Sequence, residues 1–137
     1  LGVENRCLVP ATAFSEYGKK PDPVTKRKPL HWFALDESRP LFFFAGIQTP
    51  WHGTRGSMKT PRPGEHQLFA FLTCEPNTVV GKVHPKAMPV ILTTEDEIEM
   101  WMTAEWETAQ ALQRPLADEE LIELPEEAPD EPQGRLL

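Results

Sequence analysis

The order of the secondary-structure signals limits the fold of this chain more than any other feature of its sequence. Short apolar runs typical of strands fill the part up to about residue 92, and helical spacing appears after it, between residues 94 and 113. Strand and helix signals do not alternate, so the sequence lacks the rhythm of a parallel sheet with crossover helices. It therefore predicts an α+β fold with a mainly antiparallel sheet and a few peripheral helices.

Six segments have the apolar character of strands and are bounded by turn residues. They cover residues 7–10, 30–35, 41–47, 66–73, 88–92 and 121–124. We expect 30–35 and 41–47 to pair as a hairpin across the turn at 36–40. Residues 18–29 are rich in Lys, Pro and Asp, and residues 49–65 hold three glycines and three prolines among polar side chains, so both are predicted to be loops.

Helical signals begin at a capping box. Thr94 is followed three residues later by Glu97, and the acidic side chains between them suit the positive end of a helix. Ile98, Trp101 and Met102 then recur at helical spacing. A second helical stretch is predicted over residues 105–113 and a short helical turn near 76–83, and Pro115 ends the second helix.

Length and charge predict one domain with an acidic end. The 137 residues suffice for a single core, which we place at residues 1–125, and the acidic, Pro-rich residues 126–137 are predicted to be a disordered tail. Residues 1–92 carry 12 basic and 7 acidic side chains, whereas residues 93–137 carry 2 and 14. This asymmetry permits contact with a polyanion through the body of the protein only.

Several classes of protein are poorly supported. No apolar run approaches the ~20 residues that span a bilayer, and the first residues do not resemble a signal peptide, so we expect a cytoplasmic, nucleoid-associated protein without membrane contact. Cys7 and Cys74 lack a CxxC or a companion histidine, so we expect free thiols and no metal. No Gly-rich phosphate loop or Gly-x-Ser-x-Gly elbow is present, and no cofactor is expected.

Two residues are candidates for acid–base chemistry. Glu16 lies in the short segment 13–17 among apolar neighbours, a setting that suits a proton-transferring carboxyl group, although a surface glutamate beside a charged loop fits the spacing too. His84 lies in a segment that Pro85 and Pro89 stiffen. A loop histidine with local hydrogen bonds is its alternative. Lys86 is placed to contact a phosphate.

Two basic loops lie near aromatic residues and suggest a polyanion groove. Basic side chains with stacking rings are the usual means of binding a single strand of nucleic acid. Solvated lysines and core aromatics are the alternative. The basic residues are Lys19, Lys20, Lys26, Arg27 and Lys28 in one loop and Arg55, Lys59 and Arg62 in the other, and the rings are Tyr17, Trp32 and Trp51.

Several segments, in order from Arg6 to about Leu124, resemble one known family. They are Arg6-Cys7-Leu8-Val9-Pro10-Ala11 followed by Phe14-Ser15-Glu16-Tyr17, the central strand with Phe44-Ala45-Gly46-Ile47, Phe71-Leu72-Thr73-Cys74-Glu75-Pro76-Asn77, the segment from Val83 to Leu92, and Gln113-Arg114-Pro115-Leu116. Together they resemble most of a domain of the SOS-response-associated peptidase (SRAP) family, the abasic-site-processing proteins. The resemblance implies a twisted, barrel-like sheet.

The resemblance also implies a function and a set of site residues. Members of this family bind single-stranded DNA at abasic sites, where an N-terminal cysteine condenses with the opened sugar to form a thiazolidine crosslink. By position, Glu16 matches the catalytic glutamate and His84 the histidine that assists Schiff-base chemistry and crosslink reversal. Lys86 lies near the place of a phosphate-contacting arginine. The resemblance further implies DNA contacts for Arg6, Tyr17 and Thr73.

The sequence departs from the family pattern in three ways. Ala87 is an extra residue after His84, and Tyr17 replaces the commoner Trp. The upstream segment that supplies the nucleophilic cysteine and an asparagine is not in this sequence, and Cys7 matches an internal cysteine of the family. A chain beginning at Leu1 is therefore expected not to form the crosslink. A cysteine-dependent (auto)peptidase and a non-catalytic DNA-binding remnant remain the alternative functions.

Overall fold

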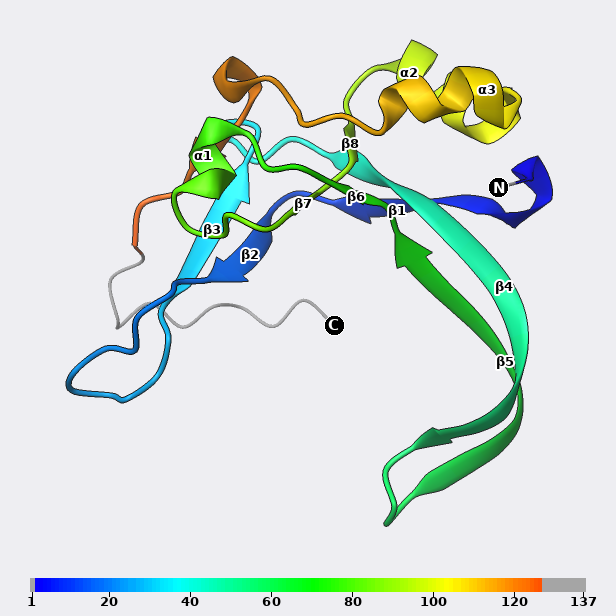
Figure 1. Cartoon of the computed structure of the whole chain (residues 1–137), viewed down its shortest axis with the longest axis horizontal. Helices are drawn as coiled ribbons and strands as arrows, with labels where there is room; N and C mark the ends of the chain where they lie inside the picture. The colour runs from blue at the N-terminus through cyan, green and yellow to red at the C-terminus, as the bar shows by residue number, and fades with distance from the viewer. Residues whose placement is uncertain (1, 127–137) are drawn as a thin grey trace.

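The computed structural model describes residues 2–126. The predicted tail at 126–137 therefore lies, except for Glu126, outside the described residues. Figure 1 shows strands that form the body and a long two-stranded projection, with helices grouped along one side. The strands are β1 (Arg6–Ala11), β2 (Phe14–Tyr17), β3 (Leu30–Ala34), β4 (Phe42–Gly56), β5 (Pro61–Phe71), β6 (Thr73–Cys74), β7 (Met88–Pro89), β8 (Ile91–Leu92) and β9 (Ile122–Glu123).

The helices are short. The α-helices are α1 (Thr78–Gly81), α2 (Glu95–Thr103) and α3 (Trp106–Ala109), and the 3-10 turns are η1 (Val3–Asn5), η2 (Gln110–Leu112) and η3 (Asp118–Glu120). The capping box predicted for α2 is confirmed, since Thr94 Oγ1 accepts a hydrogen bond from the Glu97 N–H and the Glu97 carboxylate accepts one from the Thr94 N–H. The second helical stretch is also confirmed, as α3 followed by η2.

The strands form three antiparallel sheets. In one, β4 pairs with β1, β5 and β8; in another the order is β2-β3-β9; and β6 pairs with β7. The mixed, mainly antiparallel fold that the sequence predicts is therefore confirmed. Within residues 2–126 the sheets do not close on themselves, so the barrel-like form is not confirmed.

The predicted hairpin between residues 30–35 and 41–47 is wrong. Both segments are strands, but β3 pairs with β2 and β9, whereas the first half of β4 pairs with β1 and β8. The turn between them begins with the Asp36 carboxylate accepting from the Ser38 N–H and includes Arg39 at a positive φ of 54°. The turn therefore connects β3 of the β2-β3-β9 sheet to β4 of the other sheet, and the two strands do not pair.

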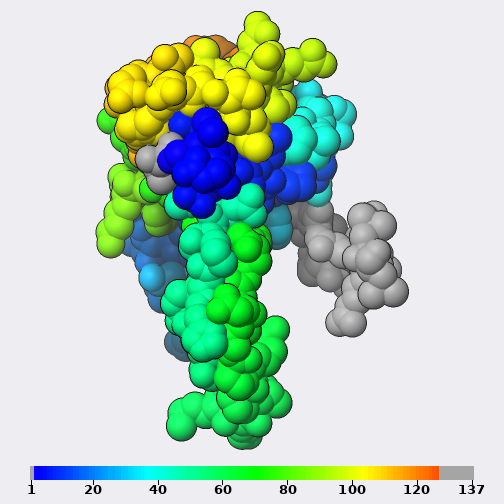
Figure 2. All heavy atoms as spheres, turned by 90° about the vertical axis from the view of Figure 1, so that its right-hand side faces the viewer, coloured from blue at the N-terminus to red at the C-terminus, as the bar shows by residue number. Residues whose placement is uncertain are grey.

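The predicted loop at residues 49–65 is also wrong. Its residues continue β4 and β5 into a long hairpin, with Thr49 paired to Leu68 and Gly56 to Pro61. The turn at the end uses Gly56 at φ +89° and a Thr60 N–H that donates to the Ser57 carbonyl. Figure 2 shows the hairpin projecting from the body as a narrow column. The glycines and prolines of this segment therefore belong to a turn and to two strands that pair only with each other.

Two apolar clusters hold the body together. One gathers aromatic side chains of β2, β3 and β4, where the rings of Phe14 and Phe33 stack with centroids 5.3 Å apart. The other packs α2 and α3 against β4 and β8 around the buried Trp101, whose indole N–H donates to the carbonyls of Cys7 and Gly46. Burial of these large side chains supplies the main driving force for folding.

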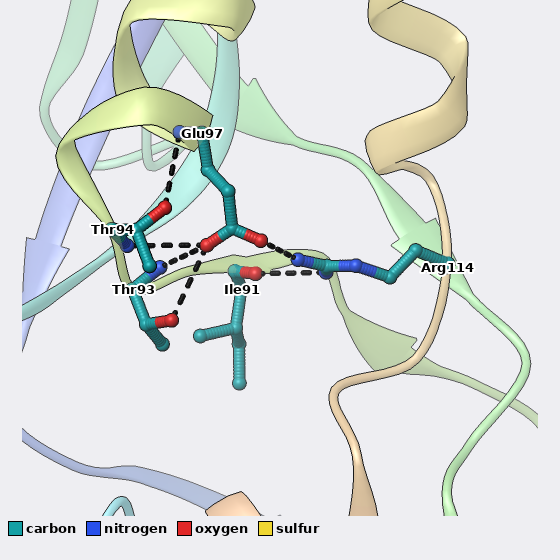
Figure 3. A network of polar contacts seen from close by, with 5 residues as sticks. All are labelled: Ile91, Thr93, Thr94, Glu97 and Arg114. Carbon is teal, nitrogen blue, oxygen red and sulfur yellow. Dashed lines mark hydrogen bonds and ion pairs between the residues drawn. The ribbon is translucent and has the colours of Figure 1, made fainter.

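A polar network ties α2 to the strands beneath it (Figure 3). The Glu97 carboxylate accepts from the backbone N–H groups of Thr93 and Thr94 and from the Arg114 guanidinium, which also donates to the Ile91 carbonyl. Burial alone raises the pKa of Glu97, but these hydrogen bonds and the nearby arginine together hold that pKa below its usual value. Arg114 therefore links α2, β8 and the segment that follows η2.

Candidate functional site

Glu16 and His84, which are 68 residues apart in the sequence, meet in the structure. His84 Nε2 lies 3.9 Å from Glu16 Oε2, and the side chains are 34% and 24% exposed. Glu16 is held by β2, in register with His31 of β3. Both side chains are thus fixed by the body of the protein while remaining open to solvent.

Local hydrogen bonds set the orientation of the His84 ring. The His84 backbone N–H donates to the Val80 carbonyl at the end of α1, and ring Nδ1 lies 2.9 Å from the Ala87 carbonyl oxygen. A carbonyl only accepts, so Nδ1 must carry a hydrogen and Nε2 is the nitrogen that exchanges a proton. The carbonyl of the extra residue Ala87 therefore fixes the tautomer of His84 and orients its Nε2 toward Glu16.

Both members of this pair line an apolar pocket. It has a volume of about 180 Å³, and its lining combines Glu16 and His84 with Phe14, Phe44, Phe71, Thr73, Met88 and Pro89 among others. The rings come from β2, β4 and β5, and the last three residues belong to the β6–β7 pair. A small ring or an unstacked sugar can enter such a pocket with its reactive atoms next to a carboxyl group and an imidazole.

Both members of the pair also line a second, basic pocket. It has a volume of about 430 Å³, and besides Glu16 and His84 it is lined by Tyr17, Gly18, Lys19, Lys28, Val83, Pro85 and Lys86. Tyr17 is 62% exposed, and the three lysines come from the 18–29 loop and the segment after His84. The acid–base pair therefore lies where an apolar pocket meets a cationic one that suits phosphates.

Five of the six site residues predicted from the sequence thus line at least one of the two pockets: Glu16, Tyr17, Thr73, His84 and Lys86. The sequence reasoning missed the contributions of Phe44 and Phe71, because nothing distinguishes a pocket-lining ring from a core ring in a strand pattern. Lys19 and Lys28 belong to the basic loop that the charge pattern identified. The second basic loop, with Arg55 and Arg62, lies instead at the tip of the long hairpin.

Arg6 lies elsewhere. It is 2% exposed, its guanidinium donates to the carbonyls of Trp101 and Ala104 at the end of α2, and it stacks on the Trp101 ring at 5.1 Å. It lines neither pocket. A cation at a helix C-terminus satisfies carbonyls that lack helical partners. The DNA contact predicted for Arg6 is therefore not part of the function proposed below.

Neither cysteine has the features of a nucleophile. Burial raises the pKa of the Cys7 thiol. Burial also raises the pKa of the Cys74 thiol; Arg114 lowers this pKa and Glu75 raises it, and the net shift is upward. Both thiols are free. Among residues 2–126 there is no group of three side chains placed to hold a metal ion. None of the helices in this part of the chain has the length and apolar character needed to cross a membrane.

The fold and the paired pockets define an antiparallel α+β protein with a candidate proton-transfer site beside a cationic surface. A sequence model described as SOS response associated peptidase (SRAP) matches residues 2–125, and the chain belongs to this family. Family membership supports a role associated with DNA damage in general. No curated protein matches the chain.

A solved structure shares the fold. It is a crystal structure of a protein from Bordetella bronchiseptica, similar at a TM-score of 0.63 and 18% sequence identity. The alignment covers 87% of this chain and 53% of that protein, so the chain spans about half the length of its neighbour. The likeness concerns the fold alone.

Proposed function

We propose that this domain binds single-stranded DNA at abasic sites, in the cytoplasm or nucleoid, and places the opened sugar against Glu16 and His84. In a protein that carries the N-terminal cysteine implied by the family resemblance, the two side chains then serve the formation of a thiazolidine crosslink. The observation that carries the proposal is the 3.9 Å approach of Glu16 and His84 at the junction of an apolar and a basic pocket.

The chemistry needs proton transfers that this pair can perform. The cysteine α-amine adds to the sugar aldehyde, water leaves to give an imine, and the thiol then adds across the C=N bond, so the net product is a thiazolidine and one water. Glu16 accepts a proton from the amine and returns one to the departing hydroxyl. His84, with Nδ1 held by Ala87, gives or takes a proton at Nε2 when the imine forms or reverts.

The surroundings suit an abasic site in a single strand. An abasic sugar has no base to fill a large cavity, and the apolar pocket of about 180 Å³ is small. Lys19, Lys28 and Lys86 line the adjoining pocket, where they can contact the phosphates on one side of the lesion. Tyr17 offers an exposed ring on which the neighbouring base can stack.

The cysteine-dependent peptidase alternative finds less support. A cysteine peptidase needs a thiolate next to a base, whereas burial raises the pKa of both thiols in this chain. Neither Cys7 nor Cys74 lines the two pockets that His84 faces. A cysteine-dependent peptidase activity would therefore need a cysteine other than Cys7 and Cys74.

The test is a crosslinking assay with a form of the protein that carries an N-terminal cysteine. Labelled single-stranded DNA with one abasic site is incubated with it and resolved on a denaturing gel. We expect a covalent band with the wild-type protein. Glu16→Gln should slow crosslink formation and His84→Ala should slow crosslink reversal, each by about 10²- to 10⁴-fold if the residue acts as a general acid or base. Glu75→Gln, an exposed carboxylate outside both pockets, is the matched control.

Three results would contradict the proposal. Normal rates in both variants would remove Glu16 and His84 from the mechanism. Cleavage of unrelated peptides, with no covalent DNA band, would favour the peptidase. Binding to intact and abasic strands with equal affinity and no band would favour a non-catalytic DNA-binding protein.

A further inference from the structure

The outer part of the β4–β5 hairpin, residues 48–69, is not explained by the site above. We name it the arm. The body strands β1 and β8 pair with β4 only as far as Ile47, so within the described chain the arm consists of two strands without a third. It projects away from the body in both views (Figures 1 and 2). A projecting hairpin offers both faces to solvent and is suited to contact a partner.

The two faces of the arm differ in chemistry. Residues opposite each other in an antiparallel pair share a face, and successive pairs alternate between faces. We name one of them the tryptophan face. From the body outward it carries the pairs Thr49–Leu68, Trp51–His66, Gly53–Gly64 and Arg55–Arg62.

The Trp51 ring lies flat on this face. A Cβ atom added at Gly53 would approach the Trp51 ring atom Cη2 to 2.3 Å, so the indole covers the Gly53 backbone. The His66 ring lies beside it, with centroids 6.0 Å apart, and is held by a hydrogen bond from Nε2 to the Arg62 carbonyl. Trp51 is nevertheless 40% exposed. One side of the indole therefore rests on the arm while the ring remains accessible to a flat group.

The tip of the same face is positively charged. Arg55 and Arg62 lie directly opposite each other, an arrangement that is destabilising for like charges unless an anion is present. Lys59 lies in the turn between them. No ion pair or hydrogen bond occupies these three side chains within residues 2–126. Glu65, the one acidic residue of the arm's sequence, lies on the opposite face, where it bonds His52 at 3.1 Å.

We propose that the tryptophan face of the arm binds single-stranded nucleic acid outside the lesion. A base stacks on Trp51, and Arg55 and Arg62, about 13 Å farther along the strand at ~3.3 Å per residue, hold phosphates. A second copy of this chain is a poorer occupant, because two copies paired through this face with their tips together would place four arginines side by side, two from each copy. The contact needs neither an abasic site nor the Glu16–His84 pair.

The test measures binding of the full chain to an undamaged, labelled oligothymidylate of about twelve nucleotides by fluorescence anisotropy. Trp51→Ala should weaken binding by roughly 5- to 150-fold, the range for loss of one stacked base, and Trp51→Phe should retain most of the affinity. Gly53→Ala should also weaken it, because the added methyl displaces the indole without removing a ring or a charge. The double variant Arg55→Gln/Arg62→Gln should lower the salt slope by about 1.4.

Arg39→Gln, in the exposed turn between β3 and β4, removes one positive charge outside the arm and is the control for charge; it should leave the affinity unchanged within about twofold. Circular dichroism checks that each variant is folded. Wild-type affinity in both Trp51→Ala and Gly53→Ala would overturn the proposal, as would variants that change sedimentation but not DNA binding. The proposed function is tested separately, since Glu16→Gln should bind the undamaged strand normally and arm variants should crosslink at the wild-type rate when DNA is saturating.

Discussion

The Glu97 carboxylate joins α2 to Arg114 and, through Arg114, to β8, and its removal makes a quantitative prediction. Oε1 accepts from the Thr93 N–H at 2.9 Å and the Thr94 N–H at 3.1 Å, and Oε2 binds the Arg114 guanidinium. Arg114 in turn holds the Ile91 carbonyl. Loss of Glu97 therefore affects the start of a helix, a strand and the segment that connects them.

The expected cost of Glu97→Ala is about 3 kcal/mol. Loss of the capping interaction accounts for about 1 kcal/mol, and loss of a partly buried hydrogen bond to a charged group for about 1.5–3 kcal/mol. For a domain of this size the melting temperature should fall by roughly 10 °C. Glu97→Gln keeps an oxygen acceptor but loses the charge, so about 1–1.5 kcal/mol is expected. Glu99→Ala, an exposed carboxylate of the same helix, should change stability by less than about 0.5 kcal/mol.

The pH dependence gives an independent check. The pKa of Glu97 is lower in the folded protein than its ordinary value of 4.5, so its charge stabilises the fold above that pH. This contribution is lost as the pH falls through the folded-state pKa. The difference between wild type and Glu97→Gln should therefore be full at neutral pH and shrink in acid.

Urea unfolding, followed by circular dichroism at neutral and acidic pH, measures these free energies. A double-mutant cycle with Arg114→Met should give a coupling energy of about 1–2 kcal/mol. The reasoning would be refuted if Glu97→Ala cost no more than Glu99→Ala, or if the penalty of Glu97→Gln were the same at both pH values.

Three further predictions concern the body and its DNA binding. Asn77→Ala should destabilise the protein by about 2–3 kcal/mol in urea unfolding, because the side chain caps α1 through the Val80 N–H and also donates to the Leu116 carbonyl. Arg6→Met should cost about 2–4 kcal/mol in the same assay, since it leaves the carbonyls of Trp101 and Ala104 without their donor; an unchanged unfolding midpoint would contradict this. The chain as it stands should bind single-stranded DNA weakly and lose affinity in salt, and tight, salt-independent binding by anisotropy would argue against phosphate contacts.

Local signals in the sequence determined much of the body. The capping box at Thr94 and Glu97 uses atoms three residues apart, and the loop at 18–29 follows from its composition, so neither depends on distant partners. The order of the motifs from Arg6 to about Leu124 also identified the family, whose sequence model matches residues 2–125. The pairing of the strands could not be predicted in the same way, because β3 and β4 are adjacent in sequence yet belong to different sheets.

Only the tertiary structure determined the surroundings of residues whose neighbours come from distant segments of the chain. It brought Glu16 to His84, buried Arg6 against the end of α2, and extended residues 49–65 as an arm instead of a loop. Sequence periodicity reports which side of a local element is apolar, whereas these outcomes depend on which elements share a core. Side-chain types and short-range caps are therefore fixed by the sequence pattern, and the meeting of two reactive groups 68 residues apart is fixed by the packing of sheets and helices.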